Sequence, residues 1–212
     1  MSNIYKFNIG NDFVTKAAHA IENFIVEQGE KPLRIALSGG NSPKAVYEKI
    51  AKSEKIDWST IELFLVDERS DHSNEAMIKE TLISKLPELK AFHPLTEKTE
   101  NQLHKLNRPF FDLVILGVGS DGHTASLFPH GPELEEVEKL VIHSKSPIPP
   151  TDRITLTYPA ILNSRKIIFL IRGADKKEII QKWLDGESSE EEIPAKAILD
   201  HEDVDIFFDY SD

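Results

Sequence analysis

The sequence predicts an α/β fold in which helices cover both faces of a doubly wound, mostly parallel sheet. Short apolar runs alternate along the chain with segments whose apolar residues recur at helical spacing. Most of these runs are continuously apolar, which is typical of strands buried on both faces of a parallel sheet. The chain has 212 residues and no internal repeat or low-complexity tract. That length suits one core, so we expect a single three-layer domain over residues 1–212.

Strands and helices alternate through the first half of the chain. Residues 4–8 alternate in polarity and predict a short edge strand. Asn11 or Asp12 is expected to cap the first helix, which Gly29 ends. The apolar face of this helix consists of Phe13, Val14, Ala17, Ile21, Phe24 and Ile25. The other elements predicted here are strands at 33–37, 61–66 and 91–95, and helices at about 44–52, 75–85 and 96–107.

The second half continues the alternation around a proline-rich break. Residues 146–150 are expected to form an extended loop, because their proline density forbids a helix. A short helix is predicted from Tyr158 to Asn163, and a longer one after Lys176 buries Ile179, Ile180, Trp183 and Leu184. An acidic surface loop is expected at 186–192. The predicted strands are at 113–116, 140–143, 153–157, 167–171 and 204–208.

Composition excludes several classes of protein. The net charge of −11 argues against a surface for nucleic acid or for anionic membranes. The chain has no cysteine, which excludes disulfides, thiolate metal sites and a cysteine nucleophile. No apolar run approaches the span of a bilayer, and the first residues lack the apolar core of a signal peptide. We therefore expect a cytoplasmic protein, for which the sequence does not separate a monomer from a homodimer.

The segment GVGSDGHT at 117–124 is the strongest candidate for a functional loop. It directly follows the apolar strand predicted at 113–116. Its three glycines let the backbone approach a ligand, and Asp121 and His123 bring a carboxylate and an imidazole into the same turn. Ligands of open α/β sheets bind at the carboxyl ends of the strands. Asp121 and His123 are therefore candidates for chemistry, and Gly119 is expected to line the ligand site.

The same loop partly matches two other known motifs. The string GVGSDG matches the dinucleotide fingerprint G-x-G-x-x-G. The dinucleotide fingerprint, however, belongs to the first strand–helix unit of a domain, whereas this string follows a strand in the middle of the chain. It also places Asp121 where its negative charge would repel a pyrophosphate. The G-x-S-x-G elbow of hydrolases is missing its first glycine, and the eight histidines show no metal-ligand spacing. A substrate-binding loop explains Asp121 and His123 best, whereas a plain strand-to-helix turn leaves them unexplained.

A second glycine turn follows the strand predicted at 33–37. It contains Gly39, Gly40, Asn41 and Ser42, followed by Pro43. Ser42 is expected to cap the next helix, with Pro43 as its first residue. Backbone N–H groups at the start of a helix bind anions, so this turn is a candidate anion site; an ordinary strand-to-helix turn is the alternative.

A cluster of charges follows the strand predicted at 61–66. Asp67, Glu68 and Arg69 come directly after its last apolar residue. They are expected at the same edge of the sheet as the two glycine turns, and a solvated loop is the alternative.

Five segments of the chain resemble the 6-phosphogluconolactonase family, which is related in fold to glucosamine-6-phosphate isomerase/deaminase. They are LSGGNSP at 37–43, VDER at 66–69, GVGSDGHTASLFP at 117–129, RITLTYPAILNS at 153–164 and, more weakly, GADK at 173–176. The string GHTASLFP has the lactonase form, whereas the deaminase branch ends in an acidic FNEP-like string. The resemblance spans most of the chain and implies the Rossmann-like, glucosamine-6-phosphate isomerase-like fold.

The resemblance implies hydrolysis of 6-phospho-D-glucono-1,5-lactone to 6-phospho-D-gluconate in the oxidative pentose phosphate pathway, without a metal or cofactor. His123 is expected to act as the general base, with Asp121 orienting it. Arg69 would stabilise the oxyanion or hold the phosphate. The phosphate is expected on the Gly39–Ser42 turn, with charge from Arg153 and Lys176. Arg153 is the stronger candidate of the two, because a charge that opens an otherwise buried segment needs a partner, whereas a lysine at a helix start is commonly a surface residue. Asp67 is expected to bind substrate.

Two other functions remain open at this point. An isomerase or deaminase of a sugar phosphate would use a carboxylate such as Asp67 to move a proton between carbons. A non-catalytic sugar-phosphate-binding protein could share the scaffold. The chain also departs from the family, because only Ser70 to Ser73 separate Arg69 from Asn74, where the family has a longer loop. The rim of the site is therefore expected to be short, and the resemblance assigns no role to His72 or Asn74.

Overall fold

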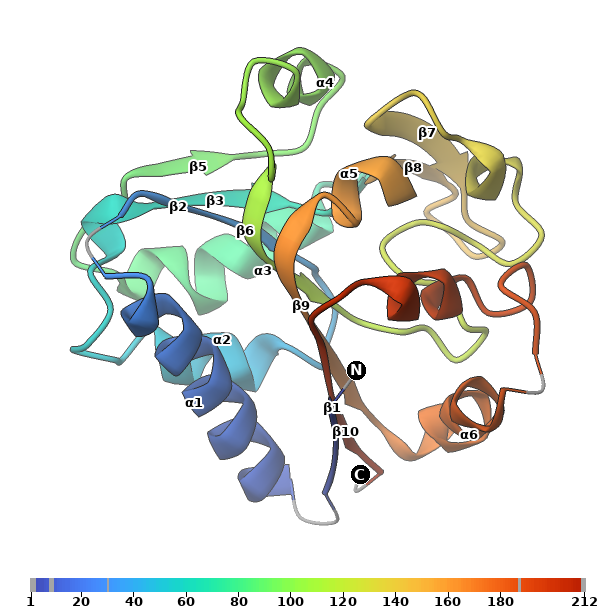
Figure 1. Ribbon diagram of the computed structural model, residues 1–212, viewed down its shortest axis with the longest axis horizontal. Coiled ribbons are helices and arrows are strands. Elements are labelled where there is room, and N and C mark those ends of the chain that lie inside the picture. Colours follow the sequence, from blue (N-terminus) through green and yellow to red (C-terminus); the bar gives the residue numbers. More distant parts are fainter. Residues whose placement is uncertain (1–2, 8–9, 30, 187, 211–212) are drawn as a thin grey trace.

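The main body of the protein is a seven-stranded parallel sheet between two layers of helices. The computed structural model describes residues 3–7, 10–29, 31–186 and 188–210 (Figure 1). The strand order is β1-β10-β9-β6-β2-β3-β5, and every neighbouring pair is parallel. The strands are β1 (Asn3–Phe7), β2 (Leu33–Leu37), β3 (Ile61–Leu65), β5 (Ala91–His93), β6 (Phe111–Leu116), β9 (Ser164–Arg172) and β10 (Val204–Asp209). The predicted α/β fold class is confirmed.

Helices bury both faces of this sheet. Figure 1 shows α1 (Gly10–Glu27), α2 (Lys44–Ile50) and α3 (Ser73–Thr81) on one side, and α6 (Lys177–Asp185) on the other. Phe169 of β9 packs edge-to-face on Trp183 of α6, with ring centroids 5.1 Å apart. A 3-10 helix, Pro194–Asp200, completes that side. In the part of the chain that the structure describes, no helix has the length and apolarity needed to span a bilayer.

A second, smaller sheet lies beyond the carboxyl edge of the main sheet. It contains β4 (Asp67–Arg69), β8 (Asp152–Leu156) and β7 (Val141–Lys145), in that order and antiparallel. Two short helices, α4 (Lys98–Leu103) and α5 (Tyr158–Ile161), lie beside it (Figure 1). The charged segment after β3 is therefore a strand. Asp67 and Glu68 are buried rather than solvated, because the pairing with β8 carries them inward.

Several helix boundaries differ from their predictions. The first helix begins at Gly10, so Asn11 and Asp12 lie within its first turn rather than at the position before it. Ser42 is not the cap of α2 either. Its hydroxyl accepts a hydrogen bond from the Arg172 N–H at 3.0 Å and donates to the Arg172 carbonyl at 3.4 Å. Ser42 thus links the glycine turn to the end of β9. Because its hydroxyl is used in these two hydrogen bonds, it does not cap the helix.

The other boundaries also shift. The predicted 75–85 helix divides into α3 and a 3-10 turn, Ile83–Lys85, and the predicted 96–107 helix shortens to α4. Strand β1 corresponds to the strand predicted at residues 4–8. The last of these positions, residue 8, is outside the described residues.

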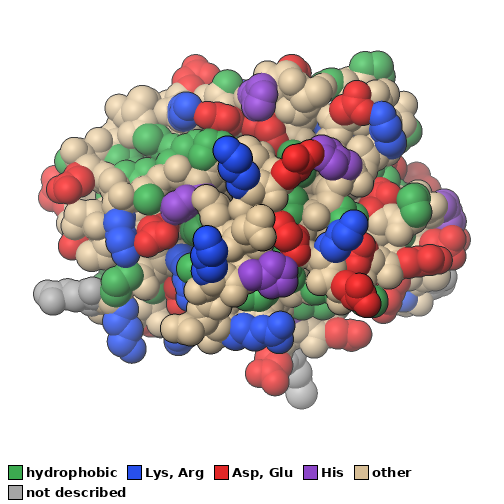
Figure 2. Space-filling model, turned by 90° about the horizontal axis from the view of Figure 1, so that it is seen from above, with side chains coloured by type: hydrophobic (Ala, Val, Ile, Leu, Met, Phe, Trp, Pro, Cys, Tyr) green, Lys and Arg blue, Asp and Glu red, His purple; other side chains and the backbone are tan. Residues whose placement is uncertain are grey.

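Charge is distributed evenly over the face seen in Figure 2. Basic side chains on this face lie singly among acidic ones. A continuous basic surface does not form there, in keeping with the net charge of −11.

Candidate active site

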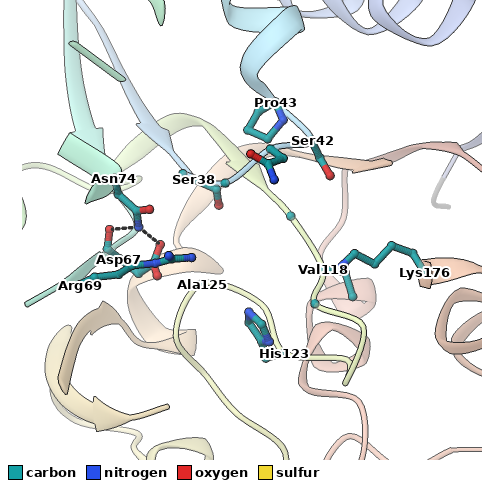
Figure 3. A pocket seen from close by; sticks show the side chains of 15 residues that line it. Ser38, Ser42, Pro43, Asp67, Arg69, Asn74, Val118, His123, Ala125 and Lys176 are labelled. Atoms are coloured by element: carbon teal, nitrogen blue, oxygen red, sulfur yellow. Dashed lines mark hydrogen bonds between the residues drawn. The ribbon is translucent and has the colours of Figure 1, made fainter. Parts of the chain in front are cut away.

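One cavity collects most of the predicted site residues at the carboxyl edge of the main sheet. It has a volume of about 210 Å³ and is formed by the turn after β2, strand β4, the loop after β6 and the start of the segment after β9. Figure 3 shows Arg69 and Lys176 entering from opposite sides, with His123 on a third. The predicted residues in its lining are Gly39, Gly40, Asn41, Ser42, Asp67, Arg69, Gly119, His123 and Lys176. Asp121 and Arg153 lie outside this lining.

His123 is held by Asp121. Its Nδ1 lies 2.6 Å from Asp121 Oδ1, and its backbone N–H donates to the same oxygen at 3.2 Å. Desolvation raises the pKa of Asp121, but the hydrogen bond and charge of His123 outweigh it and bring the pKa below its usual range. A carboxylate that stays ionised fixes the Nδ1–H tautomer, which leaves Nε2 to accept a proton. The pair is thus arranged for general-base chemistry.

Gly119 makes room for this pair. A Cβ at residue 119 would lie 2.1 Å from His123 Nδ1 and 2.5 Å from Asp121 Oδ1. The Gly119 N–H donates to the His123 carbonyl at 2.8 Å, so the loop closes on itself around the imidazole. The ring of Phe128 also packs near the imidazole, with its centroid 4.9 Å from that of His123. The absence of a side chain at Gly119 therefore leaves the space that the imidazole occupies.

Asp67 is a buried carboxylate with a partner at each oxygen. Asn74 Nδ2 donates to Oδ1 at 3.1 Å and to the Asp67 carbonyl at 3.0 Å. Ser126 Oγ donates to Oδ2 at 2.6 Å. Burial raises the pKa of Asp67, and the hydrogen bond from Ser126 and nearby positive charges offset only part of that rise. Asp67 is therefore held rigidly, which favours a positioning role over proton transfer between carbons.

Arg69 and Arg153 lie opposite each other on β4 and β8. The Nε atoms of both are buried and have no hydrogen-bond partner among the described residues. Burial lowers the pKa of Arg153, and the positive charge of Arg69 lowers it further. Arg153 opens onto a neighbouring cavity of about 800 Å³, which Asp121 also lines. Two adjacent guanidinium groups with unused N–H donors are suited to binding an anion.

Comparison with known proteins identifies the family. Residues 8–207 match the profile of the family described as glucosamine-6-phosphate isomerases/6-phosphogluconolactonase. The chain belongs to this family. It is 35% identical over 201 residues to the 6-phosphogluconolactonase of Synechocystis, covering 84% of this chain and 81% of the relative. It is 34% identical over 203 residues to a probable 6-phosphogluconolactonase of Schizosaccharomyces pombe, covering 79% of each.

Solved structures agree with this assignment. A 6-phosphogluconolactonase from Thermotoga maritima superimposes with a TM-score of 0.84 at 29% identity, covering 100% of both chains. One from Shewanella baltica gives 0.83 at 27% identity, covering 100% of this chain and 98% of the other. The resemblance inferred from the five sequence segments is confirmed.

Asn74 belongs to the site of this family member although sequence reasoning gave it no role. It is buried at the start of α3 and lines the cavity, where its side chain donates a hydrogen bond to Asp67 (Figure 3). A Cβ at residue 39 would lie 2.0 Å from Asn74 Oδ1. The sequence does contain one indication of this position. The segment between Arg69 and Asn74 is so short that the start of α3 must lie close to the end of β4. His72 precedes α3 in a left-handed conformation and lies outside the lining.

Glu68 has a structural task next to the site. Its carboxylate accepts the backbone N–H groups of Arg69, Asn74 and Glu75 at 2.7, 3.0 and 2.7 Å. Burial raises its pKa, and these hydrogen bonds offset part of that rise. Glu68 satisfies free N–H groups at the start of α3 and so fixes the position of Asn74.

Proposed function

We propose that the chain hydrolyses 6-phospho-D-glucono-1,5-lactone to 6-phospho-D-gluconate, as a 6-phosphogluconolactonase of the pentose phosphate pathway. The observation that carries this proposal is the His123–Asp121 pair, with Nδ1 and Oδ1 2.6 Å apart. It lies beside a cavity that the positively charged side chains of Arg69 and Lys176 enter from opposite sides. Relatives at 34–35% identity bear that enzyme's name. A lactone is an ester, so its hydrolysis needs the three things this site offers: a base, a charge for the oxyanion and a proton for the leaving oxygen.

The reaction follows from the arrangement of His123. Nε2 takes a proton from a water molecule, and the water oxygen forms a bond to the lactone carbonyl carbon. The oxyanion of the tetrahedral intermediate is stabilised by Arg69, which carries a permanent charge. The intermediate collapses as the bond from this carbon to the ring oxygen breaks. The imidazolium gives its proton to that oxygen, which leaves the neutral base and an open-chain acid.

The phosphate is assigned to the Gly39–Ser42 turn and Lys176. Lys176 lines the same cavity as the turn, whereas Arg153 pairs with Arg69 across β4 and β8 and lines the neighbouring cavity. Gly40 has a φ of +89°, which lets the turn present its backbone to a ligand. Arg153 is proposed to bind substrate from the Arg69 side, where it adds positive charge.

Lys176→Ala is expected to raise KM for the phosphorylated lactone while leaving unphosphorylated gluconolactone nearly unaffected. A charge-assisted contact with phosphate contributes about 1.5–3 kcal/mol, which corresponds to roughly 10- to 150-fold in KM. Steady-state kinetics with both lactones measures the difference. Arg153→Ala is the matched comparison, and its effect is expected on both substrates. A phosphate-selective effect of Arg153→Ala alone would move the phosphate to the arginine side.

The function itself is tested by comparing turnover of the lactone and of glucosamine 6-phosphate in the presence of a chelator. We expect the lactone alone to be consumed, with full activity after exhaustive chelation. In the described residues, one group of potential ligands has its atoms within 4.8 Å of one another: Glu68, His72 and Glu75. The Glu68 carboxylate already accepts three backbone N–H groups. Activity that disappears in chelator and returns with a divalent ion would contradict the mechanism.

The same assay separates the alternatives. Consumption of glucosamine 6-phosphate would favour the isomerase or deaminase, which needs a carboxylate such as Asp67 to move a proton. The hydrogen bonds at both oxygens of Asp67 count against that role. Binding of sugar phosphate without turnover of either compound would make the protein a non-catalytic binder.

A further inference from the structure

Ser126 is fixed by all three strands of the small antiparallel sheet. Its Oγ donates to Asp67 of β4 at 2.6 Å, and its N–H donates to Thr155 Oγ1 of β8 at 3.2 Å. Its carbonyl accepts from Ser144 Oγ of β7 at 2.7 Å. Ser126 is 1% exposed, and each of its polar groups has a partner. A buried residue held at every polar group has very little freedom to move.

This anchor lies three residues beyond His123, at the end of a tight turn. Thr124 and Leu127 close the turn with a hydrogen bond of 2.9 Å, and Thr124 Oγ1 donates to the Gly117 carbonyl at 2.9 Å. Within this turn, Ala125 has a φ of +51° and lines the cavity. A residue with a side chain keeps a left-handed conformation only where its surroundings impose it. Ala125 is flanked here by Thr124 and Ser126, both of which are held by hydrogen bonds.

We propose that Ser126 is a positioning residue that sets the distance between His123 and Arg69. His123 comes from a loop of the main sheet, whereas Arg69 and Asp67 share strand β4 of the small sheet. The Ser126–Asp67 hydrogen bond is a direct link between these two parts of the site. This inference rests on the proposed function, because it assigns His123 and Arg69 to the two sides of one reaction.

The same hydrogen bond favours the ionised form of Asp67. Burial raises the pKa of Asp67, and the Ser126 hydroxyl is the largest influence that lowers it. Removing the hydroxyl should raise the pKa further, so that Asp67 takes up a proton at a higher pH. Protonation would remove the negative charge beside the two arginines and weaken the placement of Arg69. The charged groups that face Asp67 are Arg69 and Glu68 on its own strand, Arg153 on β8 and His123 on the loop.

The test is the pH–rate profile of Ser126→Ala on the phosphorylated lactone. We expect kcat to fall by roughly 10- to 10²-fold with KM changed much less, because the substrate still binds but the base is misplaced. On the acid side, where the imidazole limb lies, we also expect an additional loss of rate from protonation of Asp67, which begins at higher pH than in the wild type. Ser164→Ala is the matched control, since it removes a buried hydroxyl at the start of β9 that lacks a hydrogen-bond partner in the described structure. It should change neither kcat nor the profile.

Two further variants keep the test decisive. In an Asp67→Asn background the loss caused by Ser126→Ala should shrink, because the carboxylate that it acts through is gone. Ser144→Ala removes only the bond to the Ser126 carbonyl, so it should lower kcat without moving the acid limb. If Ser126→Ala does not fold, Ser144→Ala is measured in the wild-type and in the Asp67→Asn background. An unchanged kcat, or a loss of the same size in both backgrounds, overturns the proposal.

The outcomes separate this inference from the proposed function. A wild-type protein without lactone turnover removes the proposed function itself. Normal wild-type turnover together with a folded Ser126→Ala that keeps its kcat and its acid limb overturns the positioning role and leaves the function intact. A reduced kcat with an unmoved acid limb also overturns it, since loss of packing alone would produce that result.

Discussion

His123→Ala should lower kcat for the phosphorylated lactone by roughly 10²–10⁴-fold while changing KM only modestly. General-base catalysis by a positioned side chain contributes that much, and the imidazole is the proposed carrier of both proton transfers. The fold and phosphate binding should persist, because the neighbouring glycines and Ser126 shape the loop. Steady-state kinetics with spontaneous hydrolysis subtracted gives the measurement.

The pH dependence provides an independent check of this role. The wild-type rate should rise with pH as the imidazole loses its proton, and His123→Ala should lack that rise. Asp121→Asn is the companion variant, since it keeps the shape of the 2.6 Å contact but removes the charge that fixes the tautomer. Its kcat should fall less than that of His123→Ala. A folded His123→Ala enzyme with near-normal kcat would exclude the histidine and direct attention to Asp67, Glu68 or Asp121.

Gly119→Ala is expected to reduce kcat by about 10²-fold although it adds only one methyl group. The new Cβ would lie 2.1 Å from His123 Nδ1, which is far below any permitted contact, so the imidazole must move. A displacement of about 1 Å at a catalytic group is enough for a loss of this size.

The control for this variant is Gly117→Ala in the same loop. A Cβ at residue 117 would meet only the Leu170 carbonyl, at an ordinary 3.8 Å, so a much smaller loss is expected. Comparable losses in both variants would show that the loop resists any added carbon and that the position of the imidazole is not the cause. Thermal melts of the two proteins should be recorded alongside the kinetics, to separate folding from geometry.

The main sheet could be predicted because its strands carry their own signal. Strand β6 is buried over all six residues, and its sequence is an almost unbroken apolar run. The loop after it could be predicted to bind a ligand, since the ends of parallel strands meet at one edge. Strand β4 could not be predicted, because its three charged residues show no alternation of apolar and polar side chains. They form a strand only because they pair with β8.

The network around Asp67 was also beyond sequence reasoning. It joins Asp67 to Asn74, Ser126 and, through the latter, Ser144 and Thr155. These residues come from four separate elements and a loop. The charge cluster marks Asp67, but the other four have no local pattern that sets them apart. Serine, threonine and asparagine are common on surfaces, so only the tertiary structure shows that these are buried.

The position of β1 at the edge of the sheet has a consequence for folding. Its neighbour is β10, and Asn3 Nδ2 donates to Asp205 Oδ1 at 2.8 Å across a sequence separation of 202 residues. On a ribosome the chain emerges from its N-terminus, so β1 is exposed long before its partner strand exists. The remaining strands can assemble in the meantime, because their pairings do not involve β1. Docking of β1 therefore cannot precede the synthesis of β10, and it completes the edge of the sheet.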